Sequence, residues 1–287
     1  MHFTKMQGLG NDYIYVDTSR EKVEDPSRLA ALISDRHFGI GSDGLILINP
    51  SSKADFEMEM YNADGSRGKM CGNGIRCVGK YVYDHHLTDK TTLTIETLSG
   101  IRTLKLYPGS DGRIDQVKVD MGEPVLKAAE IPMDLPMLRA AGLRHDEDTV
   151  VNFSFAFGKT DHAVTCVSMG NPHCVIFPGE DVASLPIEKT GPVIEHSPLF
   201  PEGVNTEFVN VLAKDHIRMR VWERGSGETF ACGTGACAAA VASALNGFTG
   251  RTVTVSLLGG DLHIDWQTDT GRVFMTGPAV EVYSGDI

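Results

Sequence analysis

The sequence predicts a fold of mixed strands and helices, built from two similar halves. The letters Cys-Gly-Asn-Gly at residues 71–74 return as Cys-Gly-Thr-Gly at residues 232–235, and the two cysteines lie 232 − 71 = 161 positions apart. The same offset aligns residues 56–62 with residues 217–223, and both segments alternate in the manner of a strand. Self-similarity at a fixed offset is the signature of a repeated structural unit. We therefore predict two strand–loop–cysteine–helix units in one chain.

The first half is expected to hold short strands, one amphipathic helix and the first cysteine unit. Residues 3–17 read as two strands around a glycine turn, and residues 26–36 as a helix with proline in its first turn, where proline is tolerated. The letters G-x-G-x-x-G occur at residues 39–44, but a dinucleotide site needs a strand before them and a helix after them. Here the order is reversed, since residues 45–48 read as a strand, so nucleotide binding is not favoured. A longer helix is predicted from Gly72 to about Asp84.

The second half repeats this pattern after a connecting region. Short strands are expected between residues 94 and 120, and the segment Met121 to Pro124 breaks the run. We read residues 124–150 as surface connection with one short helix. The remaining expected elements are strands at 162–167, 208–212, 253–257, 262–266, 273–275 and 280–283, and a helix at 236–246 closed by Gly247. The last two strands are expected to return to the first half, which gives domains of residues 1–122 plus 276–287 and residues 123–275.

Composition and charge argue against several classes of protein. The 287 residues include 26 basic and 38 acidic side chains, for a net charge of −12, and no long basic run is present. This balance argues against nucleic acid or an anionic membrane surface as the main partner, although a local pocket can still bind a small anion. Residues 1–8 lack the apolar stretch of a signal peptide, and no run reaches the ~20 apolar residues of a membrane helix. With six cysteines and no secretory signal, we expect reduced thiols and a cytoplasmic location.

A cysteine at the start of a helix has two chemical consequences. The N–H groups of the first turn are unpaired and carry the positive end of the helix dipole, so they bind a carboxylate, and glycine lets it come close. The same field pushes the thiol toward thiolate, below its free pKa of about 8.5. If the two halves face one another, Cys71 and Cys232 flank one bound anion. One sulfur then removes a proton from the carbon beside the carboxylate, and the other returns a proton to the opposite face.

The other four cysteines are read as structural. The x5 and x4 spacings within the two cysteine pairs do not fit the tight pairs of a zinc site, so no metal is expected. Cys77 and Cys237 fall inside the predicted helices, where we expect them to be buried. Cys166 and Cys174 fall in apolar segments and are expected in the core.

Two polar turns are candidate parts of the same site. Glu223 and Arg224 follow a strand and occupy the frame of residues 62–63 in the first half, which places both turns at one cleft. His173 lies in a Gly-Asn-Pro-His turn that the repeat aligns with residues 10–11. This alignment makes His173 a candidate for tuning one of the thiols.

These motifs resemble those of the diaminopimelate epimerase family, and the resemblance covers essentially the whole chain. The family's patterns stand here as Lys-Met-x-Gly-x-Gly-Asn-Asp at residues 5–12, Tyr-Asn-x-Asp-Gly-Ser at 61–66, Met-Cys-Gly-Asn-Gly-x-Arg-Cys at 70–77, Gly-Asn-Pro-His at 170–173, Gly-Val-Asn at 203–205 and Glu-Arg-Gly-x-Gly-Glu-Thr-x-Ala-Cys-Gly-Thr-Gly at 223–235. Motifs of this length, in this order, are highly specific.

The resemblance implies an α+β fold of two pseudo-symmetric domains, each a barrel-like β-sheet around a central α-helix, with the active site in the cleft between them. It also implies a homodimeric, cofactor-independent epimerase that interconverts LL- and meso-2,6-diaminopimelate in lysine and peptidoglycan-precursor synthesis. By this resemblance Cys71 and Cys232 are the two acid/base thiols. The implied supporting and substrate-binding residues are His173 and Glu223, then Asn11, Asn62, Gly72, Asn73, Asn171, Asn205, Arg224, Gly233 and Thr234. Among these, the amides of residues 72–73 and 233–234 hold the reacting carboxylate, and Arg224 pairs with the distal one.

Three alternatives stay open at this point. Proline or hydroxyproline racemases share the fold and the paired cysteines, but they need an apolar slot for a ring, whereas Arg224 and four asparagines suit a long substrate that is polar at both ends. A phenazine-biosynthesis isomerase would not need both cysteines. From another class, a non-catalytic thiol or zinc-binding module would require a ligand spacing that the chain lacks. Some members of the family carry glutamine where this chain has Gly44, so one substrate contact is expected to be missing.

Overall fold

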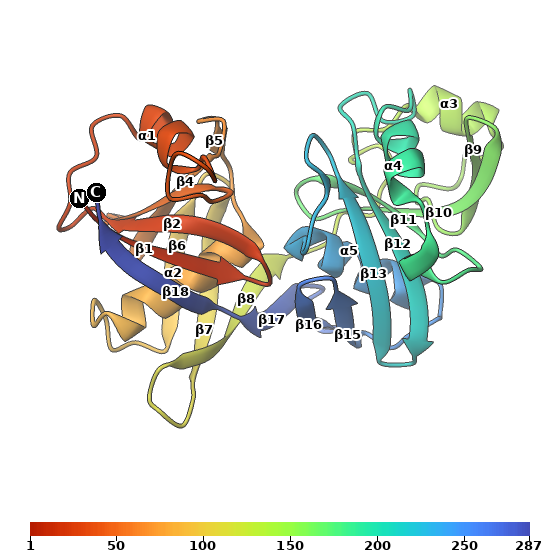
Figure 1. Cartoon of the computed structure of the whole chain (residues 1–287). Helices are drawn as coiled ribbons and strands as arrows, with labels where there is room; N and C mark the ends of the chain where they lie inside the picture. The colour runs from red at the N-terminus through yellow and green to blue at the C-terminus, as the bar shows by residue number, and fades with distance from the viewer. The chain divides into compact units, whose positions relative to one another are not determined.

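The computed structural model describes residues 1–287 and contains two compact units (Figure 1). Residues 1–120 and 276–287 form the first, here called unit 1, and residues 121–275 form the second, unit 2. Each unit curves a mixed sheet around one buried helix, which confirms the predicted α+β class of two similar domains. The final strand, blue in Figure 1, lies in unit 1 beside the N-terminal strand.

The sheet of unit 1 has the strand order β18-β1-β2-β3-β4-β6-β7-β8, with β5 beside β4. Neighbouring strands are antiparallel except in the pairs β2–β3 and β4–β6, which are parallel. The elements of this part of the chain are β1 (His2–Gly8), β2 (Asn11–Asp17), α1 (Pro26–Ile33), β3 (Gly44–Asn49), β4 (Phe56–Asn62), β5 (Arg67–Gly68), α2 (Gly72–Asp84), β6 (Thr92–Thr97), β7 (Gly100–Pro108), β8 (Ile114–Gly122) and β18 (Val280–Asp286).

The sheet of unit 2 has the strand order β9-β10-β11-β12-β13-β15-β16, with β14 beside β13. Its parallel pairs are β11–β12 and β13–β15. The elements are α3 (Leu135–Ala140), β9 (Phe153–Phe157), β10 (Thr160–Ser168), β11 (Pro172–Ile176), the 3₁₀ helix η1 (Val182–Ser184), α4 (Ile187–Glu195), β12 (Asn205–Ala213), β13 (His216–Glu223), β14 (Gly227–Glu228), α5 (Gly233–Leu245), β15 (Thr252–Leu257), β16 (Gly260–Trp266) and β17 (Val273–Pro278), whose last residues pass into unit 1.

The structural repeat follows the offset found in the sequence. Helix α2 begins at residue 72 and ends at residue 84, and adding 161 gives 233 and 245, the two ends of α5. Adding 161 to the ends of β4 gives 217 and 223, which matches β13 to within one residue. The parallel pairs also correspond, since β2–β3 and β4–β6 of unit 1 have β11–β12 and β13–β15 as their counterparts. The two halves therefore share topology as well as motifs.

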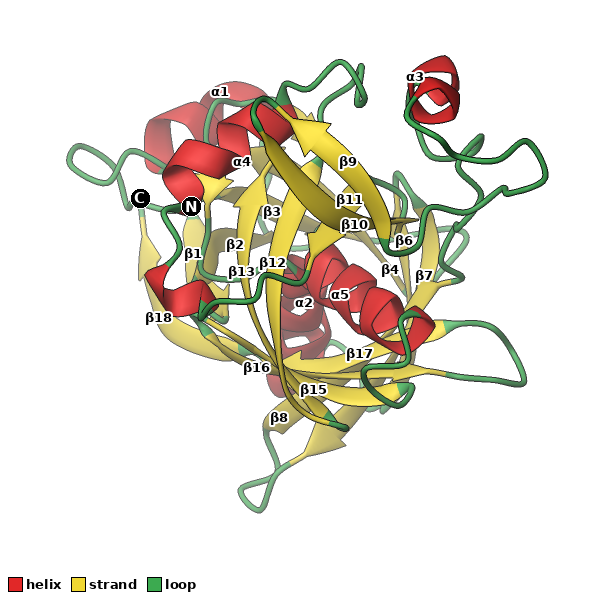
Figure 2. Cartoon of the chain, turned by 90° about the vertical axis from the view of Figure 1, so that its right-hand side faces the viewer, coloured by secondary structure: helices red, strands yellow, loops and turns green.

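Both central helices are buried along most of their length. In α2, residues 72–82 are all buried, and in the alanine-rich α5 residues 235–243 are buried. Small residues let the strands approach closely, because a Cβ added to Gly79 would lie only 2.8 Å from a methyl group of Leu104. Figure 2 shows α5 among the strands of unit 2, where it contacts β10–β13, β15 and β16. None of the helices is both long and apolar enough to cross a membrane.

The region between residues 124 and 150 is not the surface connection that its composition suggests. Leu138 in α3 is fully buried, and it shares a core cluster with Ile131, Leu143 and Val150, each at most 5% exposed. The apolar residues of this region are scattered among prolines and charged residues, so no helical or strand period marks them in the sequence. The region is part of the hydrophobic core of unit 2.

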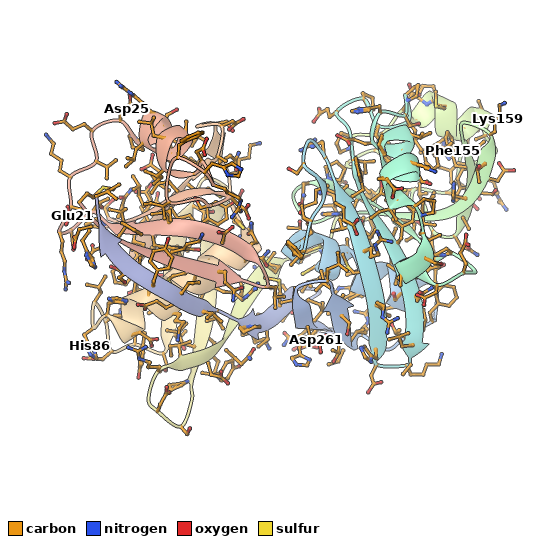
Figure 3. The ribbon with its side chains drawn as sticks, in the orientation of Figure 1. Glu21, Asp25, His86, Phe155, Lys159 and Asp261 are labelled. Carbon is orange, nitrogen blue, oxygen red and sulfur yellow. The ribbon has the colours of Figure 1, made fainter.

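Strand β9 and helix α4 of unit 2 were not predicted from the sequence. Strand β9 directs Phe155 into the same core cluster, while Lys159, in the turn between β9 and β10, lies at the outer edge of the unit (Figure 3). Helix α4 packs against β13 so closely that a Cβ added to Gly191 would lie 2.3 Å from Cγ of Trp222. Gly191 therefore allows the indole ring to lie directly on the helix backbone.

We expect the substitution Gly191→Ala to lower the free energy of unfolding by about 1–3 kcal/mol, the usual cost of forcing extra atoms into a packed site. In an open helix the same change stabilises, because glycine is the poorer helix former. The control is Gly179→Ala, since a Cβ at Gly179 would meet no atom within 4 Å. Urea denaturation of both variants measures the effect, and a Gly191→Ala protein as stable as the control would contradict the proposed packing.

Candidate active site

In unit 1, Cys71 is the N-cap residue of α2. Its backbone is extended, with φ −130° and ψ 119°, and its Sγ accepts the N–H of Gly74 at 3.3 Å. The thiol in turn donates to Oδ1 of Asn11 at 3.2 Å. The structure thus brings two predicted site residues together, and it places Cys71 at the first turn of the helix, whose N–H groups have no acceptor within the helix.

A charged network fixes the amide of Asn11. Its Nδ2 donates to Oδ2 of Asp43 at 2.7 Å, which leaves Oδ1 turned toward Cys71. Arg36 bridges Asp43 at 2.9 Å and Asp12 at 2.7 Å, and Lys5 adds an ion pair to Asp12 at 2.9 Å. Burial opposes ionisation of Asp12, but Arg36 and Lys5 outweigh it and lower the pKa of its carboxyl below the usual value. Asp43 lies in the glycine-rich loop at residues 39–44, which therefore has a positioning role that the nucleotide-binding motif did not suggest.

The other predicted residues of unit 1 support the helix start and its turn. The side chain of Asn73 is buried and accepts from Nη1 of Arg76 at 3.0 Å, and the same nitrogen donates to the carbonyl of Gly72 at 3.2 Å. Asn62 ends β4 and donates to Oγ of Ser66 at 2.9 Å, inside its own turn. Gly72 and Asn73 can therefore offer backbone amides to a ligand, whereas the Asn73 side chain is already engaged.

In unit 2, Cys232 is the N-cap residue of α5 and is only 5% exposed. Its Sγ lies 3.5 Å from Oγ1 of Thr234, and that hydroxyl accepts from Nδ2 of Asn171 at 3.3 Å. Oδ1 of Asn171 lies 3.1 Å from Nε2 of His173. His173 lies on strand β11 and not in a turn, because Pro172 is already the first residue of that strand. Four predicted site residues thus form one continuous hydrogen-bonded group.

Glu207 is a site residue that sequence reasoning missed. Its Oε1 lies 2.7 Å from Nδ1 of His173, and both side chains are fully buried. Glu207 belongs to β12, whose parallel partner β11 carries His173. The signal in the sequence is a single acidic residue in a strand that holds no other charged side chain, and a buried charge is rare unless it is paired.

Glu223 ends β13 and lies beside Cys232. Its Oε1 accepts from the hydroxyl of Thr229 at 2.5 Å, and its carboxyl also interacts with the Cys232 thiol. Burial raises the pKa of Glu223 above its ordinary value. Burial, followed by the carboxylates of Glu223 and Glu207, raises the pKa of Cys232 well above that of a free thiol. The expectation that the helix start makes this thiol more acidic is therefore wrong for Cys232, because loss of solvent and two nearby carboxylates outweigh the helix dipole.

The carboxylate of Glu195 fixes the turn that follows Glu223. Oε2 of Glu195 accepts from the indole N–H of Trp222 and Oε1 accepts from the backbone N–H of Gly225, both at 2.8 Å. Asn205, the first residue of β12, also fixes this turn, because its Oδ1 accepts from the backbone N–H of Arg224 at 2.8 Å. The Arg224 side chain is exposed and donates to the carbonyl of Glu202 at 2.8 Å.

Gly44 lies where no larger residue fits. A Cβ at this position would be 2.0 Å from the carbonyl oxygen of Tyr61 and 2.9 Å from the ring of Tyr13. A glutamine side chain would need the local backbone to shift, so this chain makes no side-chain contact from residue 44.

The four buried cysteines are packing residues, as expected. Cys77, Cys166, Cys174 and Cys237 are at most 1% exposed, and burial raises the pKa of Cys77 to about 11.

Comparison with known proteins identifies close relatives over the full length. The sequence profile of a family described as diaminopimelate epimerase matches residues 3–127 and 165–282. The chain is 54% identical to the diaminopimelate epimerase of Agathobacter rectalis, with 100% of this chain and 99% of the relative covered. It is 55% identical to the protein of that name from Acetivibrio thermocellus, with 100% and 98% covered. The corresponding protein of Methanococcus maripaludis is 53% identical, with 100% and 99% covered.

Solved structures with low sequence identity share the fold. A phenazine biosynthesis protein of the PhzF family from Bacillus anthracis has a TM-score of 0.67 at 16% identity, with 100% of this chain and 98% of that chain covered. A probable proline racemase from Agrobacterium radiobacter has a TM-score of 0.69 at 14% identity, with 100% and 92% covered. At such identities the likeness concerns the fold alone.

We expect Glu223→Gln to stabilise the fold at alkaline pH. Because the pKa of Glu223 is raised, the folded protein binds its proton more tightly than the unfolded chain, and stability is lost as the pH rises through the raised value. Glutamine carries no charge, so the variant should have the higher free energy of unfolding at pH 8. The advantage should disappear below the ordinary carboxyl pKa of 4.5, where both states of the wild type are protonated.

Urea denaturation across this pH range measures the difference between variant and wild type. Glu202→Gln is the matched control, since it makes the same chemical change at an exposed side chain. A Glu223→Gln variant that is less stable than the wild type at pH 8 would show that the charged carboxylate is well accommodated.

Proposed function

The chain belongs to the diaminopimelate epimerase family and interconverts LL- and meso-2,6-diaminopimelate, and we propose that Cys71 and Cys232 are the two groups that move the α-proton. The observation that supports this assignment is the position of each sulfur at the N-cap of a buried helix, one in each unit of a repeated fold. A carboxylate bound by the unpaired amides of such helix starts brings its α-carbon next to a sulfur.

The proposed reaction replaces the proton on the α-carbon by another on the opposite face and leaves the carbon skeleton unchanged. One thiolate takes the α-proton, so the C–H bond breaks and an S–H bond forms. The electron pair left on carbon is delocalised into the carboxylate, whose developing charge is stabilised by the amides of residues 72–73 and 233–234. The second cysteine then gives its thiol proton to the opposite face of the carbon and becomes a thiolate. Configuration is inverted, and the reverse reaction exchanges the two roles.

Glu223 is proposed as the group that activates Cys232. A buried thiol with a raised pKa needs a base, and a carboxylate whose own pKa is raised accepts a proton more readily than an exposed one. The contact between the two side chains supports direct transfer between them. In unit 1, Cys71 donates to a neutral amide oxygen instead, so the two thiols are held by chemically different partners.

The remaining predicted residues are proposed to bind the rest of the substrate. Arg224 is exposed at the end of a turn that Glu195 and Asn205 hold rigidly, so its guanidinium can pair with the distal carboxylate. Asn11, Asn62 and Asn171 supply amide groups, and Gly233 and Thr234 lie at the start of α5. We further propose that the reaction needs no cofactor and proceeds in the cytoplasm, where thiols stay reduced.

The test of the reaction is proton NMR of the purified protein with LL-diaminopimelate in deuterium oxide. We expect the α-proton signal to disappear and the meso isomer to form without any added cofactor. Cys71→Ala and Cys232→Ala should each lower turnover by at least about 10³-fold, since each removes one of the two proton-transfer groups.

Tyr107→Phe, which removes an exposed hydroxyl on β7, is the control for this experiment and should leave turnover unchanged. No exchange under reducing conditions would exclude diaminopimelate as the substrate, and exchange of proline or hydroxyproline in its place would favour the racemase alternative. Full activity in either cysteine variant would rule out the two-thiol mechanism.

We also propose that the protein is a homodimer that pairs through β18. This strand carries Val280 and Val282, which are 43% and 52% exposed, together with Tyr283 at 44%. Three large apolar side chains on one exposed strand are typical of a contact surface. Val282→Asp should weaken dimerisation at least about 10-fold in light scattering after size exclusion, because a charge would be buried in an apolar contact. The control Val211→Asp changes a similarly exposed valine on β12 and should leave dimerisation unchanged. A monomeric wild type would overturn the proposal.

A further inference from the structure

A directed chain of hydrogen bonds connects a buried carboxylate to Cys232. It runs from Glu207 to His173 at 2.7 Å, from His173 to Asn171 at 3.1 Å, and from Asn171 to Thr234 at 3.3 Å. The last step, from the Thr234 hydroxyl to the sulfur, is 3.5 Å. Glu207 begins this chain and is fully buried, so it does not touch the substrate.

The direction of the chain follows from the first two partners. Both ring nitrogens of His173 face oxygen atoms, Oε1 of Glu207 and Oδ1 of Asn171, so a ring that carries hydrogen on both nitrogens donates both bonds when Glu207 is a carboxylate. Such a ring is a cation, and the carboxylate of Glu207 balances its charge. With its Oδ1 held by His173, Asn171 can only present its NH₂ group to Thr234. The Thr234 hydroxyl accepts that bond, and its own hydrogen is left to donate to the sulfur.

The repeat shows that the fold itself does not need a charge at position 207. The offset of 161 relates Ile46 to Glu207 and Gly74 to Gly235, since 46 + 161 = 207 and 74 + 161 = 235. A Cβ on Gly74 would lie 2.7 Å from a methyl group of Ile46, and a Cβ on Gly235 would lie 2.7 Å from Oε1 of Glu207. The two side chains thus fill the same place beneath the first turn of the central helix. In unit 1 an apolar residue suffices there.

We propose that Glu207 is a positioning residue for the epimerisation: its carboxylate holds the imidazole of His173 as a donor on both sides and so aims the Thr234 hydroxyl at Cys232. This role rests on the proposed function, in which Cys232 is a thiolate for part of each cycle. A hydroxyl that donates to the sulfur stabilises that thiolate, whereas the backbone amides proposed to hold the reacting carboxylate are not part of this chain of hydrogen bonds. Glu207 is therefore expected to act mainly on the rate of proton transfer.

Loss of the negative charge of Glu207 should reverse the direction of the hydrogen bond between His173 and Asn171. In Glu207→Gln the amide oxygen can still accept from Nδ1, but no charge remains to balance an imidazolium ring. Nε2 then has no hydrogen, and Asn171 must turn its NH₂ group toward the ring. Thr234 loses its donor and no longer has a fixed direction for its own hydrogen.

The experiment combines steady-state kinetics with ¹⁵N NMR of imidazole-labelled protein, on the full chain. For Glu207→Gln we expect kcat to fall about 10- to 100-fold with KM within about twofold of the wild type, the size of loss seen when the carboxylate that orients a metal-binding histidine is removed. Glu207→Ile, which introduces the residue used in unit 1, should fold and show the same or a larger loss. The NMR spectrum of the wild type at pH 7 should show two protonated ring nitrogens for His173, and that of Glu207→Gln only one.

Thr206→Val is the matched control, because Thr206 is the neighbouring buried residue on β12 and strand alternation points it to the opposite face. It should leave both the kinetics and the imidazole signals of His173 as in the wild type. The proposal is overturned if Glu207→Gln keeps two protonated nitrogens on His173, or if folded Glu207→Ile has a kcat within twofold of the wild type. Since the NMR measurement needs no substrate, it tests the role of Glu207 even if diaminopimelate proves to be the wrong substrate.

Discussion

The N–H groups that have no acceptor within their own helix, at the starts of α2 and α5, are the constraint on which the rest of this structure depends. A buried helix start without partners costs free energy, and here a cysteine and two glycines occupy it in each unit. The strands curve around the helices so that these starts are reached by side chains from neighbouring strands, Asn11 from β2 and Asn171 just before β11. The core elements thus explain why the helices are buried and which side chains contact their first turns.

The two units share a framework but differ in the chemistry around the sulfur. Cys71 is paired with an amide oxygen that exposed and half-buried charges hold in place, whereas Cys232 lies among buried carboxylates. A duplicated fold usually begins with equal halves, and only the side chains beneath the helix starts need to change to make them unequal. Ile46 and Glu207 occupy equivalent places in the two units, and they are an example of such a change. An enzyme that removes a proton on one face and returns it on the other can use two thiols that are held by chemically different partners.

Much of this arrangement could be predicted from the sequence, because the cysteine motif and the strands around it repeat at the same offset. The bounds of α2 and the position of both cysteines follow from the letters alone, and so do the buried Cys77 and Cys237. Three features could not be predicted in this way. The core role of residues 124–150 lacks a period, the raised pKa of Cys232 depends on burial and on how Glu223 and Glu207 lie around the thiol, and the partner of Glu207 is known only once β11 and β12 are known to be neighbours. Each depends on which segments meet in space, and the sequence pattern of one segment does not contain that information.

The pairing of β1 with β18 also determines when each half can be finished during synthesis. Unit 2 is one continuous stretch of chain, but unit 1 needs its last residues, and the N-terminal amine donates to the carbonyl of Ile287 at 2.5 Å. On the ribosome, one edge of β1 therefore stays unpaired until β18 has emerged, by which time the second half can already have folded. The same adjacency means that a short linker could join the two ends and new ends could be opened in an exposed turn elsewhere, with both cores kept whole.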